Sequence, residues 1–500
     1  MIRNHPNQTE FIDFVHPFGG QLPASNRWVK LSQIVPWNEI ESLYSQSFPK
    51  TKMGAPALSG RIAFGALIIK ERLSSTDEET VAQIQENPFL QYFLGLHRYK
   101  EEPLFNPSMM VHFRNRFTQE DFQKINDLII ANATDKQDDN ASKDSDNSDD
   151  NEPPSGSSNH CGKLLVDATC TPADITYPTD LKLLNEAREK TEMFIDILHE
   201  PFVGQRKKPR TYRIQARKKY LTVAKQKRPG MRKVRKALRQ QLGFVRRNLS
   251  HIDNLLDSGS TLTLLSHYQL RSLQVIHTLY AQQLQKHESG KLSIPDRIVS
   301  ISQPHIRPIV RGKSGKSVEF GAKISVSHLA TGYVSIDKLS WDAYNESGDL
   351  IGQIERYKKR FGYYPVSVHA DSIYRNRLNR DYCKGLGIRL TGKPLGRPPK
   401  QTEKNKETLK AAKKQMQQDE RDRIPVEGKF GNAKRKGSLG RIMARLSITA
   451  ESVIHVGVIV LNLDKYLREV LCLLIRKWLN HLKSVEIRKT RNRFYPQIAV

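Results

Sequence analysis

Two periodicities of hydrophobic and polar positions divide the chain. Over residues 1–133 apolar side chains recur at helical spacing, as in GRIAFGALIIKERL, where Ile62 and Leu67 share one stripe. Thr76 followed by Glu79 fits a capping box, in which two reciprocal side-chain hydrogen bonds begin a helix. The pattern predicts an all-α N-terminal domain over these residues.

The second half of this domain, NPSMMVHFRNRFTQEDFQKINDLII, predicts two further helices with Arg114 and Arg116 exposed. The short segment SSTDEE between the two earlier helices resembles the turn of a helix-turn-helix, whose second helix enters a DNA groove. An ordinary helical bundle fits the spacing equally well, and both alternatives stay open.

Residues 134–160 read TDKQDDNASKDSDNSDDNEPPSGSSNH and are acidic and of low complexity. Such a segment has too few apolar side chains to offset the entropy lost on folding. We predict a disordered acidic linker here, and it marks the clearest domain boundary in the chain.

Beyond the linker the spacing changes to that of strands. GKLLVDATCTP predicts a strand that closes on Asp167, VEFGAKISVSHLATGYVSIDKLSW predicts a hairpin, and YPVSVHADSIY predicts a buried strand that closes on Asp371. The segment LIGQIERYKKRFG and a later polar segment carrying Glu427 predict helices. The fold class is therefore α/β, with a mixed sheet and flanking helices over residues 161–180 and 310–477.

A basic helical insertion over residues 181–309 interrupts this core. Residues 201–250 contain eighteen Lys and Arg and no Asp or Glu, within a chain of formal net charge +29. A face so lopsided repels itself unless an anion is present, although a solvated pair of basic helices is the simpler alternative. We therefore expect sequence-independent contact with nucleic-acid phosphates through this segment, including Lys207, Lys208 and Arg210.

The most apolar segment, SVIHVGVIVLNLDKYLREVLCLLI, begins at Ser452. Charged residues interrupt it well short of a membrane span, so it predicts a buried helix and no membrane partner, with a C-terminal tail over residues 478–500. The first residues contain no apolar run of signal-peptide length. The four cysteines lack the spacing of a zinc site, and these features together predict a protein of the reducing cytoplasm.

Three carboxylates occur in an informative order, because Asp167 and Asp371 close strands and Glu427 lies on a later helix. Ligands gather at the strand ends of an open sheet, and oxygen ligands suit Mg²⁺ or Mn²⁺. Two such ions can stabilise the attacking and the leaving oxygen of a phosphodiester. Each residue alone has an ordinary explanation, the Asp as a turn residue and the Glu as a salt-bridge partner. Their combined order favours a metal site.

These motifs resemble those of bacterial insertion-sequence DDE transposases: LLVDATC around Asp167, VHADSIY around Asp371, and RIPVEGKFGNAK from Arg423 to Lys434. One large subgroup of that family carries a Tyr-x2-Arg-x3-Glu-x6-Lys signature, and the Arg, Glu and Lys spacings match here. Glu420 stands where the subgroup has tyrosine, which is a departure. The N-terminal segment also resembles the helical domain that precedes the catalytic core in this family.

The resemblance implies an RNase H-like catalytic core in which Asp167, Asp371 and Glu427 are catalytic residues that bind two Mg²⁺ or Mn²⁺ ions. It implies a DNA transposase that cuts and joins the ends of an insertion sequence by phosphodiester hydrolysis and strand transfer. Its partners would be double-stranded DNA, both the inverted-repeat ends and the target, with the chain as a homodimer in the DNA complex. The helical domain over residues 1–133 would bind DNA.

On a helix of 3.6 residues per turn, Arg423, Glu427 and Lys434 lie within roughly 60° of one another. Arg423 and Lys434 are therefore expected to contact DNA phosphates beside the metal ligand. Pro425 is expected in the first helical turn, where proline is favoured. Arg397 lies in LGRPPK, which resembles the minor-groove segment of an AT-hook, although such a Pro-rich loop is often only a connector.

Two alternatives to a transposase fit the same residues. One is an RNase H-like nuclease with this metal chemistry and no strand transfer, and the other is a non-catalytic DNA-binding repressor. The presence of all three carboxylates argues against a repressor. The nuclease explains neither the N-terminal domain nor the Arg-Glu-Lys spacing.

Overall fold

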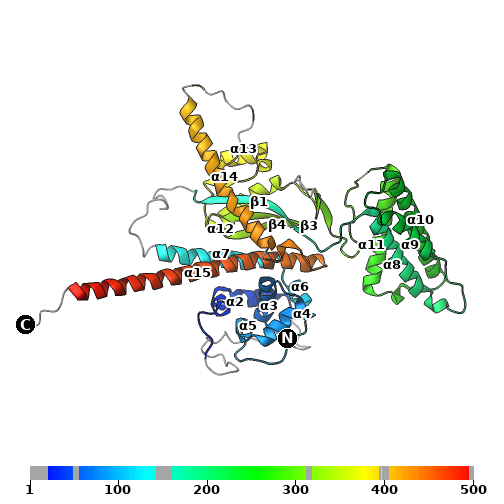
Figure 1. Cartoon of the computed structure of the whole chain (residues 1–500), viewed down its shortest axis with the longest axis horizontal. Coiled ribbons are helices and arrows are strands. Elements are labelled where there is room, and N and C mark those ends of the chain that lie inside the picture. The colour runs from blue at the N-terminus through cyan, green and yellow to red at the C-terminus, as the bar shows by residue number, and fades with distance from the viewer. Residues whose placement is uncertain are drawn as a thin grey trace, which may run out of the picture.

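The computed structural model describes residues 21–48, 56–141, 160–291, 293–310, 318–392, 396, 402, 405–435 and 437–494. It is a mixed α/β structure, in which a helical N-terminal region and a separate group of helices flank a six-stranded sheet (Figure 1). Two long helices, α14 (Lys406–Arg435) and α15 (Ser447–Phe494), run across the centre of the molecule.

The described N-terminal region is helical, as predicted, with α1 (Arg27–Ile34), α2 (Trp37–Gln46), α3 (Gly60–Leu73), α4 (Asp77–Glu86), α5 (Pro88–Phe93), α6 (Met109–Arg116) and α7 (Gln119–Ala141). Ser59 begins α3 by accepting a hydrogen bond from the Ile62 amide at 3.2 Å. Thr76 begins α4 in the same way, with the Glu79 amide as donor at 3.1 Å, so the helix start predicted there is confirmed. Satisfying the orphan amides of the first turn is what fixes both starts.

The expectation that Arg114 is exposed is wrong. The residue is 5% exposed, and its guanidinium forms an ion pair with Asp77 in the first turn of α4. Helix α6 packs against the apolar core, and this turns its basic side chain toward the acidic start of α4. Arg116 is half-buried and donates to the Ser47 carbonyl at 2.9 Å.

The boundary of the acidic linker differs from the expected one. Helix α7 continues through residues 134–141, which the sequence pattern assigned to the linker. Extending an existing helix costs far less than nucleating one, so polar residues can prolong it. Residues 142–159 of the predicted linker lie outside the described residues.

The sheet consists of β1 (Lys163–Pro172), β2 (Arg307–Val310), β3 (Val318–Leu329), β4 (Val334–Ser340), β5 (Ser367–His369) and β6 (Arg389–Leu390). Its order is β2-β3-β1-β5-β6, with β4 also paired to β3. β1 is central, antiparallel to β3 and parallel to β5, and β5 is parallel to β6. β3 and β4 form the predicted hairpin. Gly321 allows the tight β1–β3 approach, since a Cβ there would meet the Thr171 carbonyl oxygen at 2.1 Å.

Asp167 lies in the interior of β1 and not at its end, contrary to the sequence-based prediction. The strand continues to Pro172 because ATCTP keeps pairing with β3, with Thr171 opposite Ala322. Asp371 lies two residues beyond β5, where its side chain caps a short 3₁₀ turn. The first carboxylate is therefore held by the sheet, and the second by a turn at the sheet's edge.

The expected position of Pro425 is also wrong, because α14 begins at Lys406 and contains the proline in its interior. A proline there removes one backbone hydrogen bond and crowds the preceding turn. Two ion pairs hold the preceding turns of α14 on the sheet, Arg389 with Asp419 and Lys163 with Asp422. Tertiary contacts therefore maintain a helix that local propensity would end.

Helix α15 contains the apolar segment that the sequence predicts to be buried. By length and composition Ser447–Cys472 could cross a membrane, yet 72% of its most apolar window is buried inside the protein. It packs on α3, α7 and β4, between the N-terminal region and the sheet (Figure 1). The helix continues to Phe494 with no break at residue 477, after which the sequence predicts a C-terminal tail.

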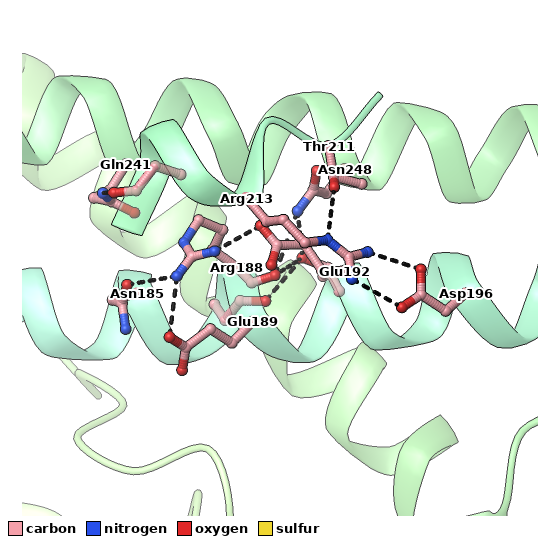
Figure 2. Close-up of polar contacts among 12 residues, drawn as sticks. Asn185, Arg188, Glu189, Glu192, Asp196, Thr211, Arg213, Gln241 and Asn248 are labelled. Carbon is pink, nitrogen blue, oxygen red and sulfur yellow. Dashed lines mark hydrogen bonds and ion pairs between the residues drawn. The ribbon is translucent and has the colours of Figure 1, made fainter. Parts of the chain in front are cut away.

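The insertion between β1 and β2 has a core of its own, built from α8 (Asp180–His199), α10 (Met231–Asp257) and α11 (His267–Ser289), and α9 (Arg213–Ala224) packs on α8 and α10 through a smaller cluster. Figure 2 shows Arg188 of α8 surrounded by polar partners. Its guanidinium donates to Glu192 at 2.6 Å and to Asn185 at 2.8 Å, and it reaches Glu189 at 3.0 Å. Asn248 of α10 donates to Thr191 at 3.0 Å and joins α10 to α8.

Replacing Glu192 with Ala is expected to lower the free energy of unfolding by about 3–5 kcal/mol, because Arg188 would remain buried without its best partner. The Glu192 side chain is 8% exposed, whereas that of Glu189 is 53% exposed. Glu189→Ala is therefore a matched control and should cost about 1 kcal/mol or less. Urea denaturation followed by circular dichroism measures both. Equal losses would contradict the central role of the Arg188–Glu192 pair.

Candidate active site

Helix α14 lies across the sheet on β1 and β5 (Figure 1). Glu427 of this helix lies near both aspartates, since it shares Arg423 with Asp371 and its charge acts on Asp167. Asp167 comes from the middle of β1, and Asp371 from the turn after β5. Because β1 and β5 are parallel neighbours, residues at corresponding levels of the two strands lie side by side. The three carboxylates therefore come from three elements that meet at one place.

Arg423 joins two of the three carboxylates. Its Nη1 lies 3.5 Å from Asp371 Oδ1, and its Nη2 lies 3.6 Å from Glu427 Oε1. The Arg423 side chain is 29% exposed, while those of Asp371 and Glu427 are 55% and 68% exposed. Both carboxylates are thus within reach of one guanidinium and remain open to solvent.

Asp167 is the most enclosed of the three. Burial raises the pKa of its carboxyl group, and the negative charges of Asp371 and Glu427 raise it further. The Ala168 amide, which donates to Asp167 Oδ1 at 2.8 Å, and the Arg423 charge act in the opposite direction. The structure therefore brings Asp167, Asp371 and Glu427 close enough for their charges to interact, and burial is the largest cause of the raised pKa of Asp167.

The turn after β5 fixes the second carboxylate. The Ser372 amide donates to Asp371 Oδ1 at 2.6 Å, so one oxygen is oriented by the backbone. Helix geometry fixes the third, since Arg423 and Glu427 are four residues apart on one face of α14. This donor set consists of carboxylate oxygens alone, and hard divalent cations prefer such ligands.

Sequence reasoning missed the residues that hold α14 in place. Arg389 of β6 makes two hydrogen bonds with Asp419, at 2.6 and 3.0 Å, and Lys163 of β1 pairs with Asp422 at 2.8 Å. His369 of β5 places Nδ1 3.5 Å from the Asp419 carbonyl oxygen. Three strands therefore each contribute a base to the helix, one to two turns before Glu427. No sequence motif marks such a set, because its members are far apart in the chain.

The trio His369, Asp419 and Asp422 can place one ligand atom each within 4.8 Å of the others. Burial lowers the pKa of His369, which favours the neutral imidazole. Burial acts to raise the pKa of both aspartates, but hydrogen bonds from Arg389 and Lys163, respectively, lower it overall. Since each carboxylate already has a cationic partner, we interpret the trio as an anchor for α14.

The other predicted DNA-contacting residues near the site have varied positions. Lys434 is half-buried near the end of α14, in the same stripe as Glu427. Glu420, at the position of the family's tyrosine, is exposed on the same helix. Arg397, with the surrounding LGRPPK segment, lies outside the described residues except for Gly396.

The basic part of the insertion presents its charge to solvent. All eighteen Lys and Arg of residues 201–250 are exposed, among them Lys207, Lys208 and Arg210. Lys208 forms an ion pair with Asp196 at 2.5 Å, and Arg213 forms another with the same carboxylate at 2.8 Å (Figure 2 shows the Arg213 pair). Most of the positive charge therefore has no acidic counterpart in its own segment.

Two parts of the chain match known protein families. Residues 16–116 match the family model described as Transposase domain (DUF772), and residues 368–464 match the model described as Transposase DDE domain. The second match contains Asp371 and Glu427 but not Asp167.

The chain is also 24% identical over 159 residues to a Rhizobium meliloti protein named "Uncharacterized protein ORF8 in nfe locus", covering 32% of this chain and 68% of the relative. No solved structure matches the chain. Two matches to transposase domains in this order, the second of them containing Asp371 and Glu427, support a DDE transposase of an insertion sequence, a class of enzyme that acts on DNA.

Proposed function

We propose that Asp167, Asp371 and Glu427 together bind two Mg²⁺ or Mn²⁺ ions on an RNase H-like core, and that the enzyme cuts the ends of its insertion sequence and joins them to target DNA. The observation that carries this proposal is the position of Arg423, whose guanidinium contacts Asp371 at 3.5 Å and Glu427 at 3.6 Å. One guanidinium therefore lies between two of the carboxylates. The negative charges of these two carboxylates raise the pKa of the third, Asp167.

The order and direction of the strands support the RNase H-like assignment. A central β1 is antiparallel to the β3–β4 hairpin on one side and parallel to β5 and β6 on the other. The first carboxylate is on the central strand, the second follows its parallel neighbour, and the third is on a helix lying over both. This is the arrangement that the resemblance implies.

The carboxylates fit divalent cations because they supply only oxygen atoms and carry an excess of negative charge where they meet. Bound ions of this kind lower the pKa of an attacking water or hydroxyl and neutralise charge on the phosphate. Arg423 has two tasks in this scheme. It holds Asp371 and Glu427 together before the ions bind, and afterwards it contacts a phosphate oxygen of the DNA end.

DNA is held outside the site by the basic insertion. Its exposed Lys and Arg neutralise backbone phosphates without reading sequence, while the N-terminal helical domain recognises the inverted repeat. The chain acts as a homodimer, one copy for each end, in the bacterial cytoplasm where the element resides. The nuclease and repressor alternatives lack support from the two transposase matches.

A cleavage assay on the DNA that flanks the gene tests this function. Purified protein with Mg²⁺ should nick a duplex carrying the element's inverted repeat at its end and should then join the freed 3′ end to a second DNA. Denaturing gels resolve the nick, and a labelled target detects the joined product. Nicking without any joined product would establish the nuclease alternative instead, and binding without nicking would establish the repressor.

Replacing Lys434 with Ala is expected to reduce end cleavage by one to three orders of magnitude, on the order of the loss from removing one electrostatic contact in an active site. The melting temperature should barely change if Lys434 binds a phosphate. Lys434→Arg serves as the control, because it keeps the charge and should retain most activity. A Lys434→Ala protein that cuts normally would exclude this role, and one with lowered stability would make Lys434 a brace for the helix.

A further inference from the structure

A groove of about 1200 Å³ lies on the side of α14 that faces away from the candidate active site. Its walls come from α14, α15, the beginning of β1, the β3–β4 turn and the starts and ends of N-terminal helices. Lys429 of α14 lines it, and at about 100° per residue Lys429 lies about 200° around the helix from Glu427. One helix thus presents the catalytic carboxylate on one side and a groove on the other.

The groove carries an excess of positive charge. Seven Lys and Arg line it against three acidic residues. Each of the three acids already has a basic partner, in the pairs Lys163–Asp422, Arg72–Asp464 and Lys465–Glu469. Four cations remain for which no carboxylate partner occurs within the described ranges: Arg27, Arg421, Lys429 and Arg468.

Lys429 is the cation with the most unfavourable surroundings. Its side chain is half-buried in the groove wall, and the positive charges of Lys465 and Arg468 on the same wall act on it. A half-buried ammonium group close to two like charges is destabilising unless an anion joins them. This grouping of cations has the electrostatic character of a phosphate-binding site.

His328 adds an independent observation. It lines the groove and is only 4% exposed, and neither of its ring nitrogens has a hydrogen-bond partner within the described part of the chain. Burial, with the charges of Lys429 and Lys465, lowers its pKa to about 4, so the ring is neutral at physiological pH. Buried polar groups are normally satisfied, and a neutral imidazole offers one donor and one acceptor to a ligand.

Much of the remaining wall is apolar, and Pro425, Leu461 and Leu471 are its accessible apolar residues. A phosphate alone would use only the cations, whereas a single nucleic-acid strand also exposes flat base surfaces that seek an apolar wall. A duplex hides those surfaces in its stack. The volume also exceeds the roughly 300–1,000 Å³ of most small-molecule sites.

We propose that this groove binds a short single-stranded segment of DNA, with phosphates at Lys429 and Arg468 and bases toward the leucines. A nick at an end creates a strand terminus that can separate from its complement, so the inference rests on the cleavage proposed above. Because Lys429 and Glu427 are on one helix, the released strand would be held behind the same helix that carries the metal ligand.

The test measures binding of a fluorescein-labelled oligothymidylate of about 12 nucleotides, within the range of roughly 4–16 nucleotides that single-strand sites span. Fluorescence anisotropy compares the full-length protein with a Lys429→Gln/Arg468→Gln variant. An Arg232→Gln/Lys236→Gln variant, which removes the same charge from the exposed basic insertion, is the matched control. A random duplex of equal length is measured in parallel.

We expect the groove variant to bind the oligonucleotide about tenfold more weakly, with a salt dependence reduced by about 0.7 log–log units for each phosphate that is no longer neutralised. Its affinity for duplex should change less, and the control should show the reverse preference. The melting temperature should stay or rise, because two of the like charges that line the groove have been removed. These readings need no cleavage, so a failure of the proposed catalysis would be detected separately by the nicking assay.

Three results would overturn the proposal. If the groove variant is folded and binds oligothymidylate as tightly as the wild type, the groove is not the binding site. If the variant loses the same affinity for single-stranded and duplex DNA, the groove contributes only general electrostatic attraction. If polyglutamate displaces the oligonucleotide from the control as well as from the wild type and binds the groove variant poorly, the occupant is an acidic polypeptide and not a strand of DNA.

Discussion

Replacing Asp371 with Asn should lower the rate of DNA-end cleavage by on the order of 10³-fold or more and leave duplex binding nearly unchanged. The amide keeps the size of the side chain and can still accept from the Ser372 amide, which now donates to Asp371 Oδ1 at 2.6 Å. It removes the negative charge that a divalent cation requires. The same loss is expected for Asp167→Asn and Glu427→Gln.

Stability should move in the opposite direction for Asp167→Asn. Burial and the neighbouring carboxylates raise the pKa of Asp167 in the folded protein, so its ionised form at neutral pH is less favourable there than in the unfolded chain. A neutral Asn removes that penalty, and the melting temperature measured without divalent metal should rise. Loss of activity with gain of stability is the signature of a functional charge, because a structural charge would lose both.

Asp381→Asn is the matched control for these variants. Asp381 is a 68% exposed aspartate of α13 (Arg377–Gly385), paired at the surface with Arg377. Its replacement removes the same charge and should change the cleavage rate less than about twofold. Cleavage that persists in Asp167→Asn or Asp371→Asn, under conditions where Asp381→Asn is also active, would show that the metal site lies elsewhere.

The order of the elements could be predicted because it depends on local periodicity. The β3–β4 hairpin, the amphipathic helix α12 (Leu350–Phe361) and the buried segment of α15 each follow from spacing within a dozen or so residues. The position of Asp371 just after a strand is equally local. In these places the side-chain pattern and the tertiary environment favour the same structure.

Predictions failed where distant residues decide the outcome. Pro425 suggested a helix start, but ion pairs from β1 and β6 hold the helix through it. Arg114 has the composition of a surface residue and is buried because Asp77 of another helix pairs with it. The strand β1 extends past Asp167 because β3 pairs with it over that length. None of these partners is adjacent in sequence, so no periodicity could reveal them.

The candidate site shows the same division. Sequence spacing placed Arg423 on the face of Glu427, and the Arg423–Glu427 distance of 3.6 Å agrees with that geometry. That the same guanidinium also reaches Asp371, and that His328 and Lys429 form a groove behind the helix, depends on how α14 lies on the sheet. In the sequence, nothing distinguishes Lys429, two positions after Glu427, from the many basic residues around it.

Removing charge from the basic insertion should produce the largest loss of affinity for DNA. Gln substitution of six exposed residues of α9 and α10 removes cations for which no carboxylate partner occurs in the described part of the chain: Arg217, Lys218, Arg232, Lys233, Arg235 and Lys236. Each phosphate that is no longer neutralised should reduce the log–log salt slope by about 0.9, so six such phosphates would weaken binding to random duplex by several orders of magnitude at low salt. Anisotropy titrations between roughly 50 and 200 mM salt would measure both quantities.

A variant that exchanges Lys and Arg at the same six positions keeps the charge and serves as the control for this loss. It should bind nearly as well as the wild type, because phosphate neutralisation depends mainly on charge and only secondarily on the shape of the cation. The six-Gln variant should lose affinity for inverted-repeat and random duplex alike, since backbone contacts carry no sequence information. If instead the random-duplex affinity and its salt slope stayed unchanged while the protein's association state shifted, these exposed cations would serve assembly of the protein and not its grip on DNA. The insertion's separate core, held by the Arg188 network, allows this distinction, because all six side chains project from its surface and none contributes to the packing beneath.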